Sequence, residues 1–116
     1  TFAFLEDVLD EIVEIFPSKI IHIGGDEAPK VHWRTCPDCQ KRMEEEGIST
    51  VEGLQSYLIT RIEKFIEANG RHIIGWDEIL EGGLAPNATV MSWRGVDGGR
   101  AAIEAGHAAI MTTGDW

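Results

Sequence analysis

Apolar residues recur along the first sixteen positions with the spacing of an amphipathic helix. The stripe comprises Phe2, Leu5, Val8, Leu9, Ile12 and Phe16. Pro17 ends it, because proline disfavours helical geometry in the preceding residue. A second helix is predicted over about residues 50 to 69, with a capping box at 49–52 and Gly70 as its closing glycine. A short third helix is predicted at 101–105, before Gly106.

Four short β-branched or apolar runs alternate with these helices and predict strands at 19–23, 72–75, 89–92 and 108–111. Strands that alternate with helices pair in parallel, so the pattern indicates an α/β fold. Periodicity alone leaves a doubly wound sheet and a barrel both open.

Each predicted strand leads directly into polar or aromatic residues. The four segments are Gly24-Gly25-Asp26-Glu27, Trp76-Asp77-Glu78, Trp93-Arg94-Gly95 and Gly114-Asp115-Trp116. In both α/β architectures, ligands bind beyond the carboxyl ends of parallel strands. We therefore predict a binding or catalytic site at this edge of the sheet.

Tryptophan is concentrated in the segments that follow strands. Trp33, Trp76, Trp93 and Trp116 all lie there, outside the helical stripes. Indole faces suit the apolar faces of a sugar ring, and carboxylates accept hydrogen bonds from its hydroxyls. The alternative is that the indoles are structural plugs of the sheet edge. Taken together, the four favour a carbohydrate ligand.

Asp26 and Glu27 are adjacent acids that follow two glycines. Successive side chains of a regular strand point to opposite faces, so both acids reach one pocket only where the strand has ended. Gly24 and Gly25 supply the backbone freedom for that turn. Two carboxylates in a confined site repel each other, which raises the pKa of one of them. A carboxylic acid that stays protonated near neutrality can act as a general acid.

Length and charge narrow the possibilities further. The chain has 116 residues, whereas a complete (β/α)8 barrel needs about 250. The fold is therefore smaller than a barrel, or the chain is a piece of a longer protein. No apolar run approaches the roughly 20 residues of a membrane span, and we expect any export signal to lie upstream. A net charge of −10 disfavours nucleic acid and anionic membranes as partners.

Cys36 and Cys39 stand in a Cys-Pro-Asp-Cys motif, in what the pattern predicts to be a polar loop. The motif is half of a zinc site or a redox pair. His32 could add a third ligand, but spacing supplies no fourth, so a metal site, a disulfide and free thiols all remain open. The histidines form no His-x-His pair, which disfavours a metal-dependent hydrolase, and we expect no metal and no other cofactor.

The segment from His22 to Glu27 resembles the active-site signature of glycoside hydrolase family twenty, the β-N-acetylhexosaminidases. The segments 75–79 and 91–95 follow in the order and spacing of those enzymes, and 33–43 is similar to the bacterial branch. The resemblance implies that residues 1–116 are a partial catalytic domain. That domain would be part of a (β/α)8 TIM barrel, covering about strands four to seven.

The resemblance further implies a retaining β-N-acetylhexosaminidase that removes terminal β-linked N-acetylglucosamine or N-acetylgalactosamine by substrate-assisted catalysis. Asp26 would hold the acetamido N–H, and Glu27 would protonate the leaving oxygen. Trp76 and Trp93 would wall the acetamido pocket, with Glu78 and Trp33 as further substrate-binding candidates. The implied partner is an amino-sugar glycan or glycoconjugate, and export to the periplasm or beyond is favoured. Oligomeric state is not indicated.

Residues 111–116 depart from the family, because they lack its usual tyrosine and aspartate arrangement. We assign Asp115 no role. Two further hypotheses remain: a sugar-binding barrel that has lost turnover, and a structural fragment. A partial barrel leaves sheet edges and one core face open, so we expect residues 1–116 alone to be inactive.

Overall fold

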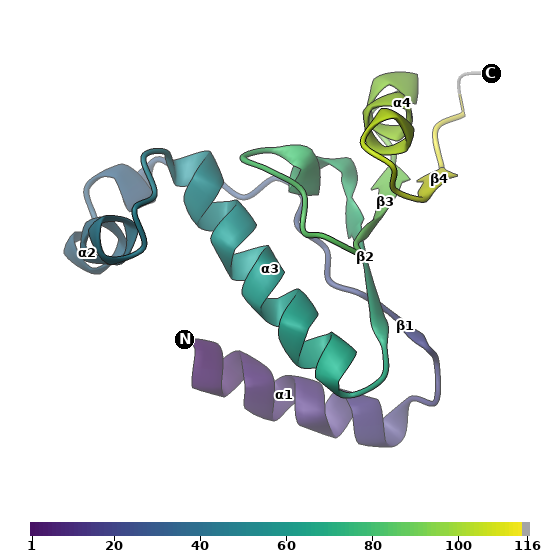
Figure 1. The fold of residues 1–116 in the computed structure, drawn as a ribbon, viewed down its shortest axis with the longest axis horizontal. Coiled ribbons are helices and arrows are strands. Elements are labelled where there is room, and N and C mark those ends of the chain that lie inside the picture. Colours follow the sequence, from purple (N-terminus) through teal and green to yellow (C-terminus); the bar gives the residue numbers. More distant parts are fainter. Residues whose placement is uncertain (115–116) are drawn as a thin grey trace.

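The computed structural model, which describes residues 1–114, places four parallel strands in one sheet in the order of the chain (Figure 1). The strands are β1 (Ile20–His22), β2 (His72–Trp76), β3 (Thr89–Ser92) and β4 (Ala109–Met111). This confirms the predicted strands and their parallel pairing. Strict chain order is the arrangement of a barrel wall, whereas a doubly wound sheet reverses its order at a switch point.

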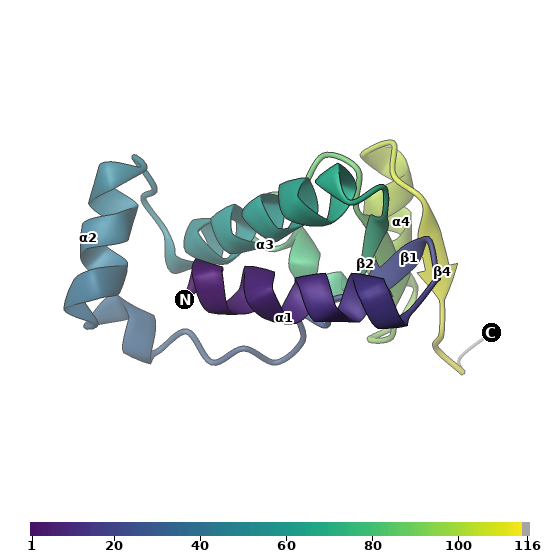
Figure 2. The ribbon, with the colours of Figure 1, turned by 90° about the horizontal axis from the view of Figure 1, so that it is seen from below.

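Two long helices pack side by side and cover the first half of the sheet (Figures 1 and 2). They are α1 (Phe2–Ile15) and α3 (Val51–Ala68). Helix α1 ends as predicted, since Phe16 before Pro17 is extended, with φ −105° and ψ 119°. Helix α3 begins with a side-chain cap, because the Gly53 N–H donates to Thr50 Oγ1 at 3.0 Å. Gly70 follows it with φ +70° and is the expected closing glycine.

The loop predicted around the two cysteines is wrong. Residues Pro37–Glu45 form helix α2, which stands apart from the sheet, preceded by the 3-10 turn η1 (His32–Arg34) (Figure 2). Of the α2 residues, Met43 alone is buried, so the helix has no apolar stripe that periodicity could detect. Its start is nevertheless regular, because proline is favoured at the first helical position.

Helix α4 (Val96–Glu104) begins five residues earlier than predicted and packs against β3 and β4. Gly98 and Gly99 weaken the helical signal, because glycine is a poor helix former. The fold needs both. A Cβ on Gly98 would lie 2.7 Å from Asp77 Oδ2, and one on Gly99 would overlap the sulfur of Met111. Close approach to the sheet therefore takes precedence over helix propensity.

The described residues cover only one of the two faces of the sheet. Register places Ile73 and Val90 on the helix side, where both are fully buried in the main apolar cluster. The other face carries Ile20, which is 50% exposed, and Ile110, which is 39% exposed. This open apolar face is what the expected partial barrel would have. No helix within residues 1–114 is long and apolar enough to cross a membrane.

Candidate active site

The carboxyl ends of β2 and β3 bring three of the predicted site residues together. Trp93 Nε1 donates to Glu78 Oε2 at 3.0 Å. The rings of Trp76 and Trp93 meet edge to face, with centroids 6.4 Å apart and planes inclined by 70°. His22, the last residue of β1, packs on Trp76 with a centroid distance of 4.8 Å. We call Trp76, Glu78 and Trp93 the indole wall.

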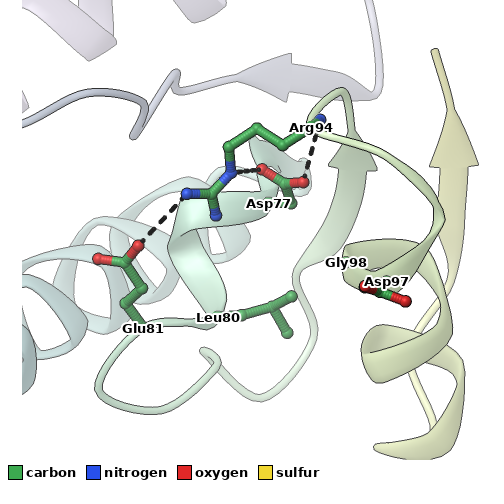
Figure 3. Close-up of a pocket in the computed structure, with 6 residues that line it drawn as sticks. All are labelled: Asp77, Leu80, Glu81, Arg94, Asp97 and Gly98. Atoms are coloured by element: carbon green, nitrogen blue, oxygen red, sulfur yellow. Dashed lines mark hydrogen bonds and ion pairs between the residues drawn. The ribbon is translucent and has the colours of Figure 1, made fainter. Parts of the chain in front are cut away.

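An acidic network centred on Arg94 supports this wall (Figure 3). Arg94 Nε lies 2.8 Å from Asp77 Oδ1 and 3.6 Å from Glu78 Oε1. Its Nη1 lies 3.7 Å from Glu81 Oε1, and the other oxygen of Glu81 accepts a bond of 2.9 Å from Lys30 Nζ. One guanidinium therefore links three acids that follow β2.

Burial makes this arrangement electrostatically demanding. Asp77 and Glu78 are 2% and 6% exposed, and buried carboxylates need cationic or hydrogen-bonded partners. Burial of Arg94 disfavours its charged form, but the bond to Asp77 and the charges of Asp77, Glu78 and Glu81 prevail and raise the pKa of Arg94 above its ordinary value. The guanidinium stays charged, and Glu78 keeps an oxygen for the indole N–H.

Asp77 and Glu78 belong to the turn η2 (Asp77–Leu80), and two buried polar side chains hold this turn in place. Ser92 Oγ lies 3.4 Å from Asp77 Oδ2, donates to the Gly95 carbonyl at 2.7 Å and accepts the Gly99 N–H at 3.1 Å. Gln55 in α3 donates to the Glu78 carbonyl at 3.0 Å. A cavity of about 440 Å³ lies beside the network, between Asp77, Leu80, Glu81, Arg94, Asp97 and Gly98 (Figure 3).

Sequence reasoning gave Asp77, Arg94, Ser92 and Gln55 no role. For Asp77 and Arg94 a signal was present, because they lie one and two residues beyond the ends of neighbouring strands and carry opposite charges. Ser92 and Gln55 carried no comparable signal. A serine within a strand and a glutamine on a helix are uninformative until the fold shows that both are buried.

The segment that carries Asp26 and Glu27 leaves β1 through two glycines in left-handed conformation, with φ +75° at Gly24 and +97° at Gly25. It stays attached to β2, since the Trp76 N–H donates to the Gly24 carbonyl at 2.9 Å. The carboxylate of Asp26 turns back over Gly24, where its Oδ1 lies 3.5 Å from the position of a Cβ.

Glu27 itself has φ +45° and is the one non-glycine residue with positive φ among residues 1–114. A left-handed backbone costs a side-chain-bearing residue about 1 to 3 kcal/mol, and such strain is concentrated at functional sites. The acid is therefore held in an unfavourable conformation by its surroundings.

Ile79 explains why this segment needs glycine. The side chain is fully buried, and its Cγ2 lies 2.6 Å from where a Cβ would be on either Gly25 or Gly75. Any larger residue at those positions would displace Ile79, and with it the η2 turn that holds Asp77 and Glu78. The two strand ends are thus locked together through one isoleucine.

The predicted acids Asp26 and Glu27 and the predicted Trp33 lie in different surroundings from the indole wall. Asp26 and Glu27 are both exposed in this chain. Trp33 lies in η1 and lines cavities of about 420 and 360 Å³ next to α1 and α3, among whose lining residues neither Trp76 nor Trp93 occurs. Asp115 and Trp116 lie outside the described residues. Within residues 1–114, no three His, Cys, Asp or Glu side chains converge as a metal site would require.

A parallel sheet whose strands run in chain order and end in acids and indoles has the ligand-binding edge of an α/β barrel enzyme, and comparison identifies the family. The chain belongs to glycosyl hydrolase family 20, whose catalytic domain matches residues 1–116. The family's solved members are (β/α)8 barrels, so the open sheet is part of such a barrel.

Named relatives agree with this assignment. A β-hexosaminidase of Porphyromonas gingivalis is 56% identical over 97% of this chain, and one of Vibrio furnissii is 40% identical over 80%. The chain spans only 14% and 15% of the lengths of these two relatives.

Solved structures of this family have the same fold over nearly the whole chain. The β-N-acetylhexosaminidase of Bacteroides fragilis superposes with a TM-score of 0.89 at 32% identity, over 97% of this chain and 24% of its own. The exo β-N-acetylglucosaminidase of Vibrio harveyi, solved with N-acetylglucosamine, gives a TM-score of 0.88 at 26% identity, over 97% and 18%.

Proposed function

We propose that the protein containing this chain is a retaining β-N-acetylhexosaminidase. It would release terminal β-linked N-acetylglucosamine or N-acetylgalactosamine from a glycan or glycoconjugate. The observation that carries the proposal is the placement of the indole wall directly beside the strained Gly-Gly-Asp-Glu segment, in a member of this family. The relatives named as β-hexosaminidases support the same reaction.

In the proposed mechanism the substrate supplies its own nucleophile. The acetamido oxygen attacks the anomeric carbon while the glycosidic C–O bond breaks, and Glu27 gives its proton to the departing oxygen. Asp26 accepts a hydrogen bond from the acetamido N–H and stabilises the positive charge of the oxazolinium-like intermediate. Water then attacks the anomeric carbon and Glu27 recovers a proton from it.

The indole wall would orient the acetamido group. Trp76 and Trp93 present two inclined aromatic faces, and enclosure by them would exclude water and fix the attacking oxygen near the anomeric carbon. Glu78 would act mainly through Trp93, because its Oε2 already accepts the indole N–H. Arg94 would hold that carboxylate in place through their ion pair of 3.6 Å.

The exposure of Asp26 and Glu27 fits a site that other parts of the barrel complete. The chain spans about one seventh of the length of its Porphyromonas gingivalis and Vibrio furnissii relatives, and one face of the sheet that carries the acids is open. We propose that residues 1–116 are one part of a catalytic barrel domain and have no hydrolytic activity alone. Trp33 remains a candidate for contact with a more distant part of the substrate.

The test is an assay of the full-length protein with chromogenic N-acetyl-β-glucosaminide and N-acetyl-β-galactosaminide. Turnover of either, with inhibition by a thiazoline mimic of the intermediate, would support the proposal. A 2-fluoro sugar should leave no ester on the protein, because no side chain is the nucleophile. Detection of such an ester would refute substrate assistance, and binding without turnover would favour a lectin-like barrel instead.

A further inference from the structure

We propose that Cys36 and Cys39 form a redox-active pair that undergoes thiol–disulfide exchange, with Cys36 as the attacking thiol and Cys39 as the resolving one. The pair lies where the segment that carries Asp26 and Glu27 joins helix α2. The inference concerns sulfur chemistry and does not depend on the proposed hydrolase.

The first turn of α2 places the two thiols together. Cys36 is the N-cap residue with an extended backbone, at φ −71° and ψ 118°, Pro37 is the first helical residue, and Cys39 stands one turn on. The side chain of an N-cap residue is directed over the first helical turn, toward the third helical residue, which here is Cys39. This placement puts the two sulfurs on the same side of the turn, where a small adjustment can bring them into bonding distance.

Both thiols are free and half-buried, so solvent reaches them. Cys39 lines the cavity of about 420 Å³ that also contains Trp33, and the ionisable groups around that cavity are Asp38, Arg42 and Tyr57. The cavity gives a small disulfide molecule room to approach. No third ligand-type side chain within residues 1–114 joins the pair to make a metal site.

The two sulfurs differ in electrostatic environment. The backbone N–H and then the thiol of Cys39 approach the Cys36 sulfur and lower the pKa of Cys36. The same contact with Cys36, followed by burial, raises the pKa of Cys39. Because the thiolate is the nucleophile and a helix N-terminus favours it, the N-cap position of Cys36 assigns the attack to that residue, and the asymmetry agrees with it.

The exchange balances with a disulfide molecule as the oxidant. Cys36 thiolate attacks one sulfur of that molecule, whose S–S bond breaks and whose other half leaves as a thiolate. Cys39 then loses its proton and attacks the Cys36 sulfur, which forms the Cys36–Cys39 bond and releases the second half. The pair loses two electrons, and the small disulfide gains them as two thiols.

Oxidation of the pair would restrict the backbone where the segment after Glu27 joins helix α2. The Cys36 N–H donates to the His32 carbonyl at 3.0 Å, and Gln40 Nε2 donates to the Trp33 carbonyl at 2.8 Å. The first turn of α2 therefore already holds η1 and the backbone of Trp33. A covalent link across that turn would fix its starting geometry.

The test uses the full-length protein equilibrated in mixtures of oxidised and reduced glutathione, then alkylated and mapped by peptide mass. We expect a Cys36–Cys39 bond that forms and is reduced again within that range of mixtures. Cys39→Ser should accumulate a glutathione adduct on Cys36. In the reduced wild-type protein, where the two thiols keep their contact, alkylation of Cys39 at pH 7 should be about tenfold slower than that of Cys36.

Three outcomes would overturn the proposal: two thiols that never pair, a bond that glutathione does not reduce, or equal alkylation rates of the two thiols in the reduced wild-type protein. The wild-type mapping needs no substitution, so it remains informative if a variant fails to fold. Because every readout is the state of the sulfurs, loss of hydrolysis would bear on the proposed enzyme and not on this pair.

Discussion

At the end of β2, Asp77 and Glu78 are buried and bonded to Arg94, Ser92 and Trp93, whereas at the end of β1, Asp26 and Glu27 are exposed. The first pair is positioned by side chains. The second is positioned by backbone, through two left-handed glycines and a strained Glu27. The two neighbouring strand ends thus present acids of the same kind in opposite ways.

Under the proposed function, the first pair would have a supporting role and the second a chemical one. Buried, bonded acids have their oxygens occupied and can orient their neighbours. Exposed acids have oxygens free to meet a substrate, and the backbone strain at Glu27 is the kind found at reacting groups. The indole wall belongs to the first region and borders the second, through the packing of His22 on Trp76.

The largest effect that is common to activated and unactivated substrates is expected at Asp26. Asp26→Asn removes the charge that would stabilise the intermediate, so activity of the full-length protein should fall by about 10² to 10³ for activated and unactivated substrates alike. Asp10→Asn is the matched control, since Asp10 is exposed on helix α1, away from the strand ends, and its substitution should leave kcat unchanged. Equal activity of the two variants would remove the catalytic role of the β1 end.

Gly25→Ala tests the lock between the two strand ends. The added Cβ would meet Ile79 Cγ2 at 2.6 Å and would stand at φ +97°, so we expect a loss of about 2 to 4 kcal/mol in unfolding free energy. Gly47→Ala shares the positive φ, at +67°, but has no atom within 4 Å. Denaturant unfolding of both variants isolates the clash, and equal losses would show that Ile79 does not matter.

Trp93→Phe tests the indole wall. The variant keeps a ring but leaves Glu78 Oε2 without its N–H donor, and we expect KM to rise about tenfold, from a loss of about 1 to 2 kcal/mol. Trp33→Phe, made in a residue that lines the helical cavities instead, should change KM much less. A larger rise in KM for Trp33→Phe than for Trp93→Phe would indicate that the sugar contacts η1 and not the indole wall.

The smallest effect is expected at Glu63, far from either acid pair. Burial raises its pKa, as does the charge of Glu67, against the Asn87 N–H bond and the charges of His107 and His72. The folded state therefore favours protonated Glu63, so this stabilising contribution is present at acid pH and falls as pH rises through the folded pKa.

Glu63→Gln is uncharged at every pH and should remove that fall, with a gain of about 1 kcal/mol or less near neutrality. Thermal unfolding of the full-length protein at acid and neutral pH measures it. Glu14→Gln is the control, because Glu14 is exposed on helix α1 and is not among the groups that shift the pKa of Glu63. A stability gain that did not depend on pH would contradict the assignment.

Sequence predicted those parts of the fold whose hydrophobic period is unbroken. The four strands and the helices α1 and α3 follow from apolar spacing and from Pro17, Thr50 and Gly70. Helix α2 was not predicted, because it buries only one side chain, Met43, and so shows no apolar period. The start of α4 was not predicted. Its residues Gly98 and Gly99 are required by close contact with Asp77 and Met111, which lie far away in the chain.

The site was predictable in part for the same reason. Parallel strands bring their carboxyl ends to one edge, so Trp76, Glu78 and Trp93 met there as expected. Burial of Asp77 and the bonds of Arg94 depend on packing that spacing does not encode. The left-handed backbone of Glu27 likewise depends on its surroundings, since nothing in the residue type predicts it.

The most direct measurement of the central claim is the leaving-group dependence of Glu27→Gln in the full-length protein. If Glu27 is the proton donor, the variant should lose most of its activity, about 10² to 10⁴-fold, on a natural glycan. It should lose far less on an aryl glycoside that departs without a proton. Equal losses on both substrates, or unchanged hydrolysis of the glycan, would contradict the account.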